Sequence, residues 1–536
     1  MIWRAQPIIG IKTGGWKRRE EGYIQRLYDK NQAANNFAHI ITHHLVVRRQ
    51  KMVDLEKELA AMREYYSSGN TRDASWRRAQ LRGLLLLLHE NQTEIFNVLK
   101  QDLGKHPAEA YRDEIGSTIK SINYALDNLK GWMSSEKAKL PKVALLTTAA
   151  IVPEPLGLVL VISSWNFPIG LSIEPLIGAI AAGNSMVLKP SELAPSCSSF
   201  LAQKIPAYLD SNGIKVIEGG PTVGEQLLQQ KWDKIFFTGS AGVGRIVMAA
   251  AAKHLTPVTL ELGGKCPAIV DFLSSSWDIE VAVERVLGAK FSACAGQACI
   301  GIDYILVEKK FYPTLVELIK IKLKTMFGEN PRDSHSVARI INRHHFLRLK
   351  CLLDDPNVRA SIVHTKKSQE VYIEPTILVD PPLESMIMED EIFGPLLPII
   401  TLQKIEDSIE FIRSRPKPLS LYAFTNDRSL RKRIISETSS GSVVFNDALI
   451  QYLADTLPFG GIGDSGIGRY HGKFSFDEFT HYKAVAWRSF LVDFWFRFPP
   501  WNDHKLQLFR HCYEYDYLGV ILTVLRLKKP KPSSAS

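Results

Sequence analysis

The sequence has little of what marks several common protein classes. It contains only six cysteines in 536 residues, and no two of them form a Cys-x-x-Cys pair. A disulfide framework and a structural zinc site are therefore not expected, and we predict no metal site. No apolar run reaches the roughly 18–20 residues that span a bilayer, and the first residues lack the apolar core of a secretory signal. These absences favour a globular protein of a reducing compartment, and we predict a cytoplasmic one.

Basic charge gathers at the two ends of the chain. Of the formal net charge of +10, residues 1–51 carry +7 and residues 526–536 carry +4, which leaves −1 for the body. A nearly neutral body argues against a nucleic-acid-binding domain, whose basic residues cluster on the fold itself. We predict that residues 1–51 are an extension that is disordered or directs the chain to an organelle.

The C-terminal tail, residues 492–536, contains the stretch "DYLGVILTVLRLKK", a short apolar run followed by basic side chains. The apolar part, residues 517–525, is too short to span a membrane but can lie on one. Basic residues beside it would attract anionic lipids. The tail therefore predicts a peripheral membrane contact or a preference for long-chain substrates.

Hydrophobic patterns divide the chain into a helical first part and an alternating remainder. Residues 53–138 are expected to be helical, and apolar spacing predicts a helix over residues 76–104 with Gly104 as its C-cap. Beyond them, short apolar segments alternate with helical patterns, and a second alternating block runs from about residue 267 to 450. This alternation is typical of parallel sheets, so the predicted fold class is α/β.

The segment "FSACAGQACIG", residues 291–301, holds two cysteines five positions apart. A nucleophilic thiol needs exposed, positively polarised backbone, often where a loop enters a helix. Cys299 is a candidate nucleophile because the small residues around it would let a substrate approach; a buried apolar role is the alternative. For Cys294 a packing role fits better, with a redox partnership with Cys299 as the alternative.

Two further segments offer polar groups after apolar, strand-like stretches. Glu261 in "LELGGKC" could act as a general base if burial raises its pKa; a solvated or salt-bridged glutamate is the alternative. Asn166 in "SSWNFPIG" could donate to a developing oxyanion. Its alternative is a turn-forming role before Pro168.

Three segments could hold a dinucleotide, although each is ordinary by itself. In "FFTGSAGVG" the glycines lie between a strand and a helix whose N-terminus could hold a pyrophosphate, but their spacing is not GxGxxG. "VLKPSE" offers Lys189 and Glu192 to a ribose. "EIFGP" offers Glu391 to a second ribose and Phe393 as a wall.

Together these segments resemble the aldehyde dehydrogenases, and most closely the class 3, fatty-aldehyde-type members of plants. Eight motifs follow the order of that family: "SSWNFP", "LKPSE", "FFTGSAGVG", "LELGGK", "GQAC", "EIFGP", "FND" and "PFGGIGDSGIGRYHGKFSFDEFTH". The resemblance covers residues 53–500. It implies NAD(P)-dependent oxidation of medium- or long-chain aliphatic, or aromatic, aldehydes to carboxylic acids through a cysteine thiohemiacetal and a thioester.

The resemblance also implies roles for individual residues. Cys299 would be the nucleophile, Glu261 the general base, and Asn166 the oxyanion donor together with the backbone N–H of Cys299. The implied cofactor residues lie at the pyrophosphate (Gly239, Ser240, Gly244), at the adenosine ribose (Lys189, Glu192) and around the nicotinamide end (Trp165, Glu391, Phe393). Glu192 favours NAD, because a carboxylate repels the 2′-phosphate of NADP, although class 3 relatives often use both.

The architecture implied by the resemblance is a Rossmann-type cofactor domain mainly within residues 52–260 and an α/β catalytic domain at 261–450. Residues 451–491 would return to the cofactor domain. Strands near 140–152 and 483–491 would bridge the protomers of a homodimer. The expected partner is a small aldehyde and not a nucleic acid, and a non-catalytic nucleotide-binding scaffold of the same fold is the alternative function.

Overall fold

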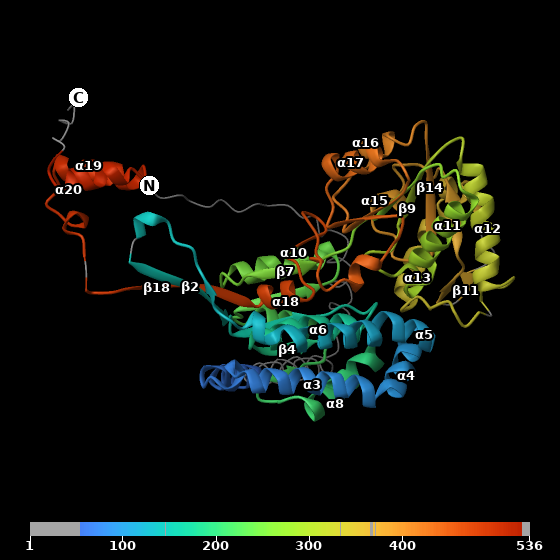
Figure 1. Cartoon of the computed structure of the whole chain (residues 1–536). Coiled ribbons are helices and arrows are strands. Elements are labelled where there is room, and N and C mark those ends of the chain that lie inside the picture. The colour runs from blue at the N-terminus through green and yellow to red at the C-terminus, as the bar shows by residue number, and fades with distance from the viewer. Residues whose placement is uncertain are drawn as a thin grey trace, which may run out of the picture. The chain divides into compact units, whose positions relative to one another are not determined.

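The computed structural model describes residues 54–144, 146–332, 334–364, 368–369, 371–491 and 493–527. The chain divides into two units, residues 1–62 and 63–536. Of the first unit only residues 54–62 are described, and they are helical. The predicted N-terminal extension, residues 1–51, therefore lies outside the described residues. All elements named below belong to the second unit (Figure 1).

A helical segment precedes the first sheet. It consists of α3 (Ala74–Glu90), α4 (Gln92–Leu103), α5 (Pro107–Ala110), the π-helical turn η2 (Tyr111–Ile115) and α6 (Gly116–Trp132). Gly104 caps α4 with a left-handed φ of 64°, as predicted. The helix predicted over residues 76–104 is in fact two helices. It breaks at Asn91, whose backbone N–H and side-chain Nδ2 both donate to the carbonyl of Leu87.

The first large sheet has six strands in the order β17-β7-β6-β3-β4-β5. These are β3 (Leu158–Ile162), β4 (Ser185–Lys189), β5 (Ile214–Val216), β6 (Lys234–Thr238), β7 (Val258–Glu261) and β17 (Gly466–Ile467). Only β17 runs antiparallel to its neighbour. The order moves outward from β3 to β5 and then resumes at β6 on the other side of β3. In such sheets ligands bind at this reversal, beyond the carboxyl ends of the strands.

Helices cover the strands of this sheet. Almost every residue of β3, β4 and β6 is buried for that reason. They are α7 (Gly170–Ala182), α8 (Pro195–Tyr208), α9 (Pro221–Leu228), α10 (Ala241–Ala252) and α18 (Lys473–Glu478). Every residue of α7 is buried, because this helix packs against α3, α6 and α18.

The second large sheet has seven strands in the order β10-β13-β14-β9-β8-β15-β16. They are β8 (Pro267–Val270), β9 (Tyr304–Glu308), β10 (Ile362–His364), β13 (Thr376–Val379), β14 (Leu396–Leu402), β15 (Ser420–Phe424) and β16 (Ser442–Phe445). All are parallel except β10. The helices among them are α11 (Ser276–Phe291), α12 (Tyr312–Phe327), α13 (Arg343–Asp354), α14 (Pro356–Ala360), α15 (Met386–Glu389), α16 (Asp407–Arg413) and α17 (Arg428–Glu437). Two parallel sheets with connecting helices confirm the predicted α/β class.

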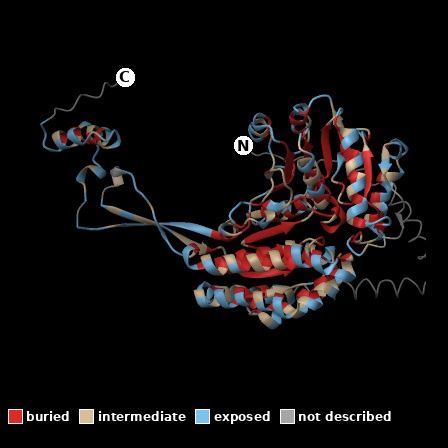
Figure 2. Cartoon of the chain, turned by 45° about the vertical axis from the view of Figure 1, so that its right-hand side comes forward, coloured by how far each residue is buried: buried red, intermediate tan, exposed pale blue. Residues whose placement is uncertain are grey.

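One apolar core joins the two large sheets, since it includes residues of both, such as Val161 of β3 and Val270 of β8. The central strands of both sheets are buried, whereas β18 is mostly exposed and its partner β2 is mostly half-buried (Figure 2). Loops at the strand ends are thus held by a common core.

A third, three-stranded sheet has the order β1-β2-β18. Its strands are β1 (Glu136–Lys137), β2 (Thr147–Pro155) and β18 (Thr480–Arg488), and they pair antiparallel. The strands predicted near 140–152 and 483–491 therefore exist and pair with each other, with shifted bounds. Two helices follow, α19 (Asp503–Tyr513) and α20 (Tyr517–Val524). No helix within the described residues is long and apolar enough to cross a membrane.

Candidate active site

The loop that carries Cys299 runs from α11 to β9 and has an unusual backbone. Cys294, Ala295 and Gly296 have positive φ angles of 50°, 50° and 79°, a conformation that residues other than glycine rarely adopt. After this turn Cys299 is partly exposed, while Cys294 is buried. Cys299 is therefore the thiol of this loop that a substrate can reach.

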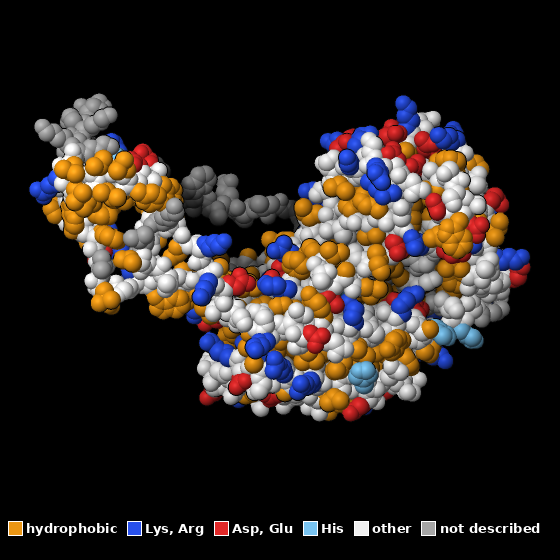
Figure 3. All heavy atoms as spheres, in the orientation of Figure 1, with side chains coloured by type: hydrophobic (Ala, Val, Ile, Leu, Met, Phe, Trp, Pro, Cys, Tyr) orange, Lys and Arg blue, Asp and Glu red, His pale blue; other side chains and the backbone are white. Residues whose placement is uncertain are grey.

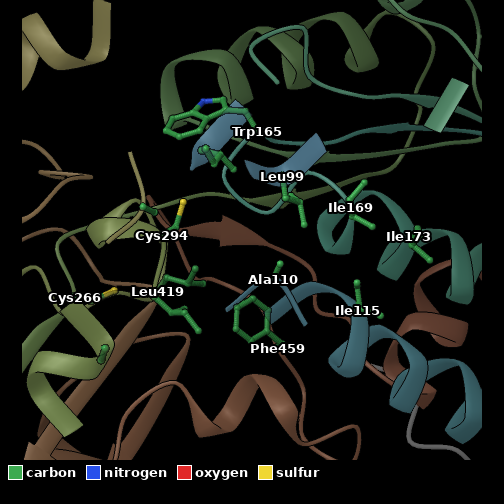
Figure 4. Packing of buried hydrophobic residues seen from close by; sticks show 14 of the residues in the cluster. Leu99, Ala110, Ile115, Trp165, Ile169, Ile173, Cys266, Cys294, Leu419 and Phe459 are labelled. Carbon is green, nitrogen blue, oxygen red and sulfur yellow. The ribbon is translucent and has the colours of Figure 1, made fainter. Parts of the chain in front are cut away.

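Cys294 lies among apolar residues of the core (Figure 4). Its backbone N–H donates to Oε1 of Glu109 at 2.8 Å. Burial raises the pKa of its thiol to about 12, so the thiol keeps its proton at neutral pH. These properties favour the packing interpretation of Cys294 over the redox one.

Asn166 follows β3 and directs its amide to the same loop. Its Nδ2 donates to the backbone oxygen of Gln297 at 2.9 Å, and its Oδ1 has no partner among the described residues. A primary amide has two donor hydrogens, so one hydrogen attaches the side chain to the loop and the other stays available. A flipped amide would place Oδ1 against the Gln297 carbonyl, which the repulsion of two acceptors disfavours.

Gln297 has a role that the sequence patterns did not reveal. It is fully buried, its Nε2 donates to the carbonyls of Cys294 and Arg339 at 2.9 Å each, and its Oε1 accepts from the N–H of Ile341 at 3.1 Å. These bonds hold the loop two residues before the reachable thiol. The available signal was the "GQAC" motif, because a glutamine in a small-residue, buried segment needs partners for all its polar atoms.

Glu261 is the last residue of β7 and is 3% exposed. Neither carboxylate oxygen has a hydrogen-bond partner in the described part of the chain, so the solvated and salt-bridged alternatives do not apply. Burial raises the pKa of this carboxyl well above its usual range, and the nearby charge of Glu478 raises it further. A buried carboxyl without a hydrogen-bond partner can accept a proton from water once it is ionised. The raised pKa means that ionisation occurs at higher pH than for an ordinary glutamate.

Cys266 contacts the backbone of the Cys299 loop, and no sequence pattern indicated this role. Its Sγ donates to the backbone oxygen of Cys299 at 3.3 Å and accepts from the N–H of Ser420 at 3.3 Å. It lies in the apolar core (Figure 4), and burial raises the pKa of its thiol well above the usual range. Cys266 is therefore an inert structural thiol, and only its tertiary contacts reveal this role.

Lys189 and Glu192 form an ion pair beyond the carboxyl end of β4. The Lys189 Nζ lies 2.8 Å from Glu192 Oε2 and is nearly buried, whereas the glutamate is exposed. A Cβ on Gly224 of α9 would lie 3.8 Å from Lys189 Cε, so this pair borders the start of α9. An ammonium and a carboxylate at this edge can bind the hydroxyl groups of a ribose.

Gly239, Ser240 and Gly244 lie where β6 turns into α10. Ser240 is the N-cap of α10, and its Oγ accepts a backbone N–H of the first turn at 3.4 Å. A Cβ on Gly244 would lie 2.8 Å from Cδ2 of Leu262. This glycine therefore lets α10 pack closely against the residue after β7, which leaves the helix N-terminus at the edge of the sheet.

Glu391, Phe393 and Trp165 meet near the glycines that follow Glu261. The Glu391 carboxylate lies against Gly263, where a Cβ would collide with it, and accepts the backbone N–H of Gly264. Burial raises the pKa of Glu391 to about 8. The Phe393 and Trp165 rings pack edge to face with centroids 5.2 Å apart, so segments far apart in the sequence form one wall.

The electrostatic environment of Cys299 opposes ionisation of its thiol. Burial raises the pKa of Cys299 above its usual range, and negative charge on Glu391 and Glu261 would raise it further. Burial is the largest of these effects and therefore the main obstacle. The N–H groups of Cys299 and Ile300 lower the pKa of the thiol, and a base or a nearby positive charge would complete its activation.

Among the described residues, Glu174, Asp455 and His471 form a buried group with ligand atoms within 4.8 Å of one another. Asp455 already accepts from Lys120 Nζ at 2.7 Å and from Ser121 Oγ at 3.0 Å. The ammonium supplies the positive charge that a metal ion would bring, so this group does not overturn the prediction of no metal site.

Comparison with known proteins decides the family. A model described as "Aldehyde dehydrogenase family" matches residues 41–485. The chain belongs to the aldehyde dehydrogenase family. Its relative "Aldehyde dehydrogenase family 3 member F1" of Arabidopsis thaliana is 55% identical over 89% of this chain and 99% of its own length. The resemblance stated from the motifs, including class 3, is thereby confirmed.

Two further similarities bear on this aldehyde dehydrogenase. The Rattus norvegicus protein "Aldehyde dehydrogenase, dimeric NADP-preferring" is 42% identical over 84% of this chain and 98% of its own length. The substrate-bound structure of Staphylococcus aureus AldH is 40% identical, with a TM-score of 0.81 over 87% of this chain and 99% of that one. The chain is therefore an oxidoreductase that acts on aldehydes, and its family uses NAD or NADP.

Proposed function

We propose that this aldehyde dehydrogenase acts by covalent catalysis at Cys299. The observation that best supports the proposal is that Asn166 and Glu261 both lie close to the loop that carries Cys299. Asn166 bonds to Gln297, two residues before the reachable Cys299 thiol, and Glu261 is close enough for its charge to act on that thiol. Asn166 follows β3, Glu261 is the last residue of β7, and Cys299 lies in the loop before β9.

In the proposed reaction the Cys299 thiolate attacks the aldehyde carbon, so that a C–S bond forms and the carbonyl oxygen becomes an oxyanion. The free N–H of Asn166 and the backbone N–H of Cys299 donate to that oxygen. The carbon then gives up a hydride, for which NAD or NADP, when bound, supplies the acceptor. Water attacks the remaining thioester while Glu261 accepts its proton, and the carboxylic acid leaves as the C–S bond breaks and the Cys299 thiolate is restored.

The residues at the edge of the first sheet, together with Glu391 before β14, fit a dinucleotide by their chemistry. Lys189 and Glu192 would hold the adenosine ribose, Gly239 and Ser240 the pyrophosphate at the start of α10, and Glu391 the second ribose. The carboxylate of Glu192 supports a preference for NAD, whereas the name of the rat relative supports NADP. Steady-state rates with each cofactor test this proposal, and a clear NADP preference would contradict the argument from Glu192.

We also propose a homodimer. The rat relative is named as dimeric, and β18 lies at the edge of the three-stranded sheet with mostly exposed residues. An exposed edge strand of nine residues is normally covered, and a second copy could cover it. Sedimentation of the purified chain tests this, and a monomer at micromolar concentration would refute it.

The C-terminal helices support a peripheral membrane contact and a preference for long-chain aldehydes. Leu518, Ile521 and Leu525 in or next to α20 are 66%, 54% and 60% exposed, and apolar side chains gather over α19 and α20 (Figure 3). A surface of this kind can lie on a bilayer. Deletion of residues 513–536 should reduce both vesicle binding and activity on long aldehydes; if neither changes, the proposal fails. Cytoplasmic location and targeting by residues 1–51 remain predictions.

The deciding experiment mixes the purified protein with NAD and a medium-chain aldehyde and follows NADH absorbance. Activity that disappears in Cys299→Ala would support both the reaction and its nucleophile. Activity that survives in that variant would point to another thiol. No activity with NAD or NADP across several aldehydes would favour the non-catalytic scaffold.

A further inference from the structure

A buried lysine lies directly behind the proposed oxyanion donor. The side chain of Lys105 is 0% exposed. Its Nζ donates to the backbone oxygen of Asn166 at 2.8 Å and to Oε1 of Glu114 at 2.5 Å, and it lies 4.1 Å from the ring centroid of Phe167. The buried ammonium of Lys105 is thus bonded to Asn166, the residue whose side-chain amide contacts the Cys299 loop.

Glu114 completes this arrangement at the other end of the same segment. Its second oxygen, Oε2, accepts the N–H groups of Ile169 at 2.8 Å and Gly170 at 3.3 Å. The Lys105–Glu114 pair therefore bonds to the first residue and to the last two residues of the stretch 166–170, where β3 gives way to α7. Buried ion pairs contribute little net stability compared with apolar packing, so fixing the conformation of this stretch is the clearer consequence of the pair.

The helix that carries Glu114 also reaches the nucleophile loop. In an α-helix, side chains five residues apart diverge by about 140°, at about 100° per residue, but the i→i+5 bonding of a π-helical turn brings them closer to one face. Glu109 lies five residues before Glu114 and accepts the N–H of Cys294 at 2.8 Å. The π-helical turn η2 therefore allows one short stretch to bond to both loops of the site.

We propose that Lys105, held by Glu114, is a positioning residue for Asn166. Its bond to the Asn166 carbonyl sets the backbone from which the amide reaches the oxyanion. The inference rests on the proposed role of Asn166. In the described part of the chain, Lys105 donates hydrogen bonds to Asn166 and Glu114, which are both buried. Because the oxyanion forms only during the reaction, loss of this positioning lowers kcat and leaves KM nearly unchanged.

The test compares Lys105→Met with the wild type. Methionine keeps most of the length and the apolar body of lysine but cannot donate to Asn166. We expect kcat to fall about ten- to hundredfold, the range for a misplaced catalytic group, and KM for aldehyde and NAD to change less than about threefold. Lys204→Met is the matched control, because Lys204 forms a more exposed pair with Glu94 at 2.6 Å; it should behave as the wild type.

A double-variant cycle separates positioning from general damage to the fold. If Lys105 acts through Asn166, Lys105→Met combined with Asn166→Ala is no slower than Asn166→Ala alone. Losses that multiply would overturn the inference. An inactive wild type, or an Asn166→Ala variant as fast as the wild type, would instead refute the proposed function.

A second variant guards against a failure of Lys105→Met to fold. Lys105→Met with Glu114→Gln removes both charges together and keeps an acceptor for the amides of Ile169 and Gly170, which avoids an unpaired buried charge. The same loss of kcat is expected. Wild-type kcat in this folded double variant would overturn the role of Lys105.

Discussion

Replacing Asn166 with alanine separates what its amide does for the fold from what it does in the reaction. The replacement removes the 2.9 Å bond from Nδ2 to the Gln297 carbonyl. A buried acceptor left without its donor costs about 1–3 kcal/mol of unfolding free energy. Loss of one oxyanion donor costs about 2.7–4 kcal/mol of transition-state stabilisation, which is about 10²–10³ in kcat. KM should change little, because the oxyanion is absent from the bound substrate.

The assay combines initial rates of NADH formation at saturating substrates with urea unfolding. Asn128→Ala is the matched control, since this partly buried amide also donates to a carbonyl, that of Tyr124 in α6, at 2.8 Å. The control should keep its kcat and lose less stability, because the Tyr124 carbonyl lies within α6 and keeps its helical N–H donor. If Asn166→Ala loses stability but retains more than about a tenth of wild-type kcat, its amide is structural and the oxyanion assignment is refuted.

Three further predictions concern Glu261, Gly263 and His471. Glu261→Gln should abolish the rise of kcat with pH that a raised carboxyl pKa produces, which a pH–rate profile measures. Gly263→Ala should raise KM for the cofactor several-fold with little change in unfolding temperature, because the new Cβ would displace the Glu391 carboxylate; an unchanged KM would contradict this contact. Burial lowers the pKa of His471 to about 3, whereas an unfolded histidine titrates near 6.5. Its contribution to stability is therefore complete above pH 6.5 and falls by about 1.4 kcal/mol per unit as the pH drops towards 3. Between pH 7 and 5 the wild type should lose about 2 kcal/mol more than His471→Asn in urea unfolding, and equal losses would refute the argument.

Much of the fold followed from local patterns. Alternating apolar strands and helices predicted two parallel sheets, because a strand covered on both faces is apolar throughout. The ordered motifs identified the family. Most residues they singled out lie at or after the carboxyl ends of β3, β4, β6 and β7, whereas Cys299 precedes β9 and Glu391 and Phe393 precede β14. Boundaries were less accurate: Asn91 interrupts a helix in which apolar spacing continues, since its side chain competes for the Leu87 carbonyl.

The supporting residues could not be predicted from the sequence. Lys105 and Asn166 are 61 positions apart, and nothing near either residue indicates that they bond. In the sequence Cys266 is one of six scattered cysteines, and only the structure shows that its thiol donates to the Cys299 carbonyl. Such residues are defined by tertiary contacts, and a local pattern contains no information about a partner that lies in another segment.

The shape of the nucleophile loop depends on contacts within the loop and with two other segments. Left-handed conformations at Cys294 and Ala295 cost roughly 1–3 kcal/mol each, and the loop would relax without restraints. Gln297 and Glu109 supply these restraints as hydrogen bonds. At Gly296 the loop packs so closely against the carbonyl of Gly394, next to the Phe393 wall, that a Cβ would collide with it. The strained turn before Cys299 is therefore held by hydrogen bonds from Gln297 and Glu109 and by close packing against the segment before β14.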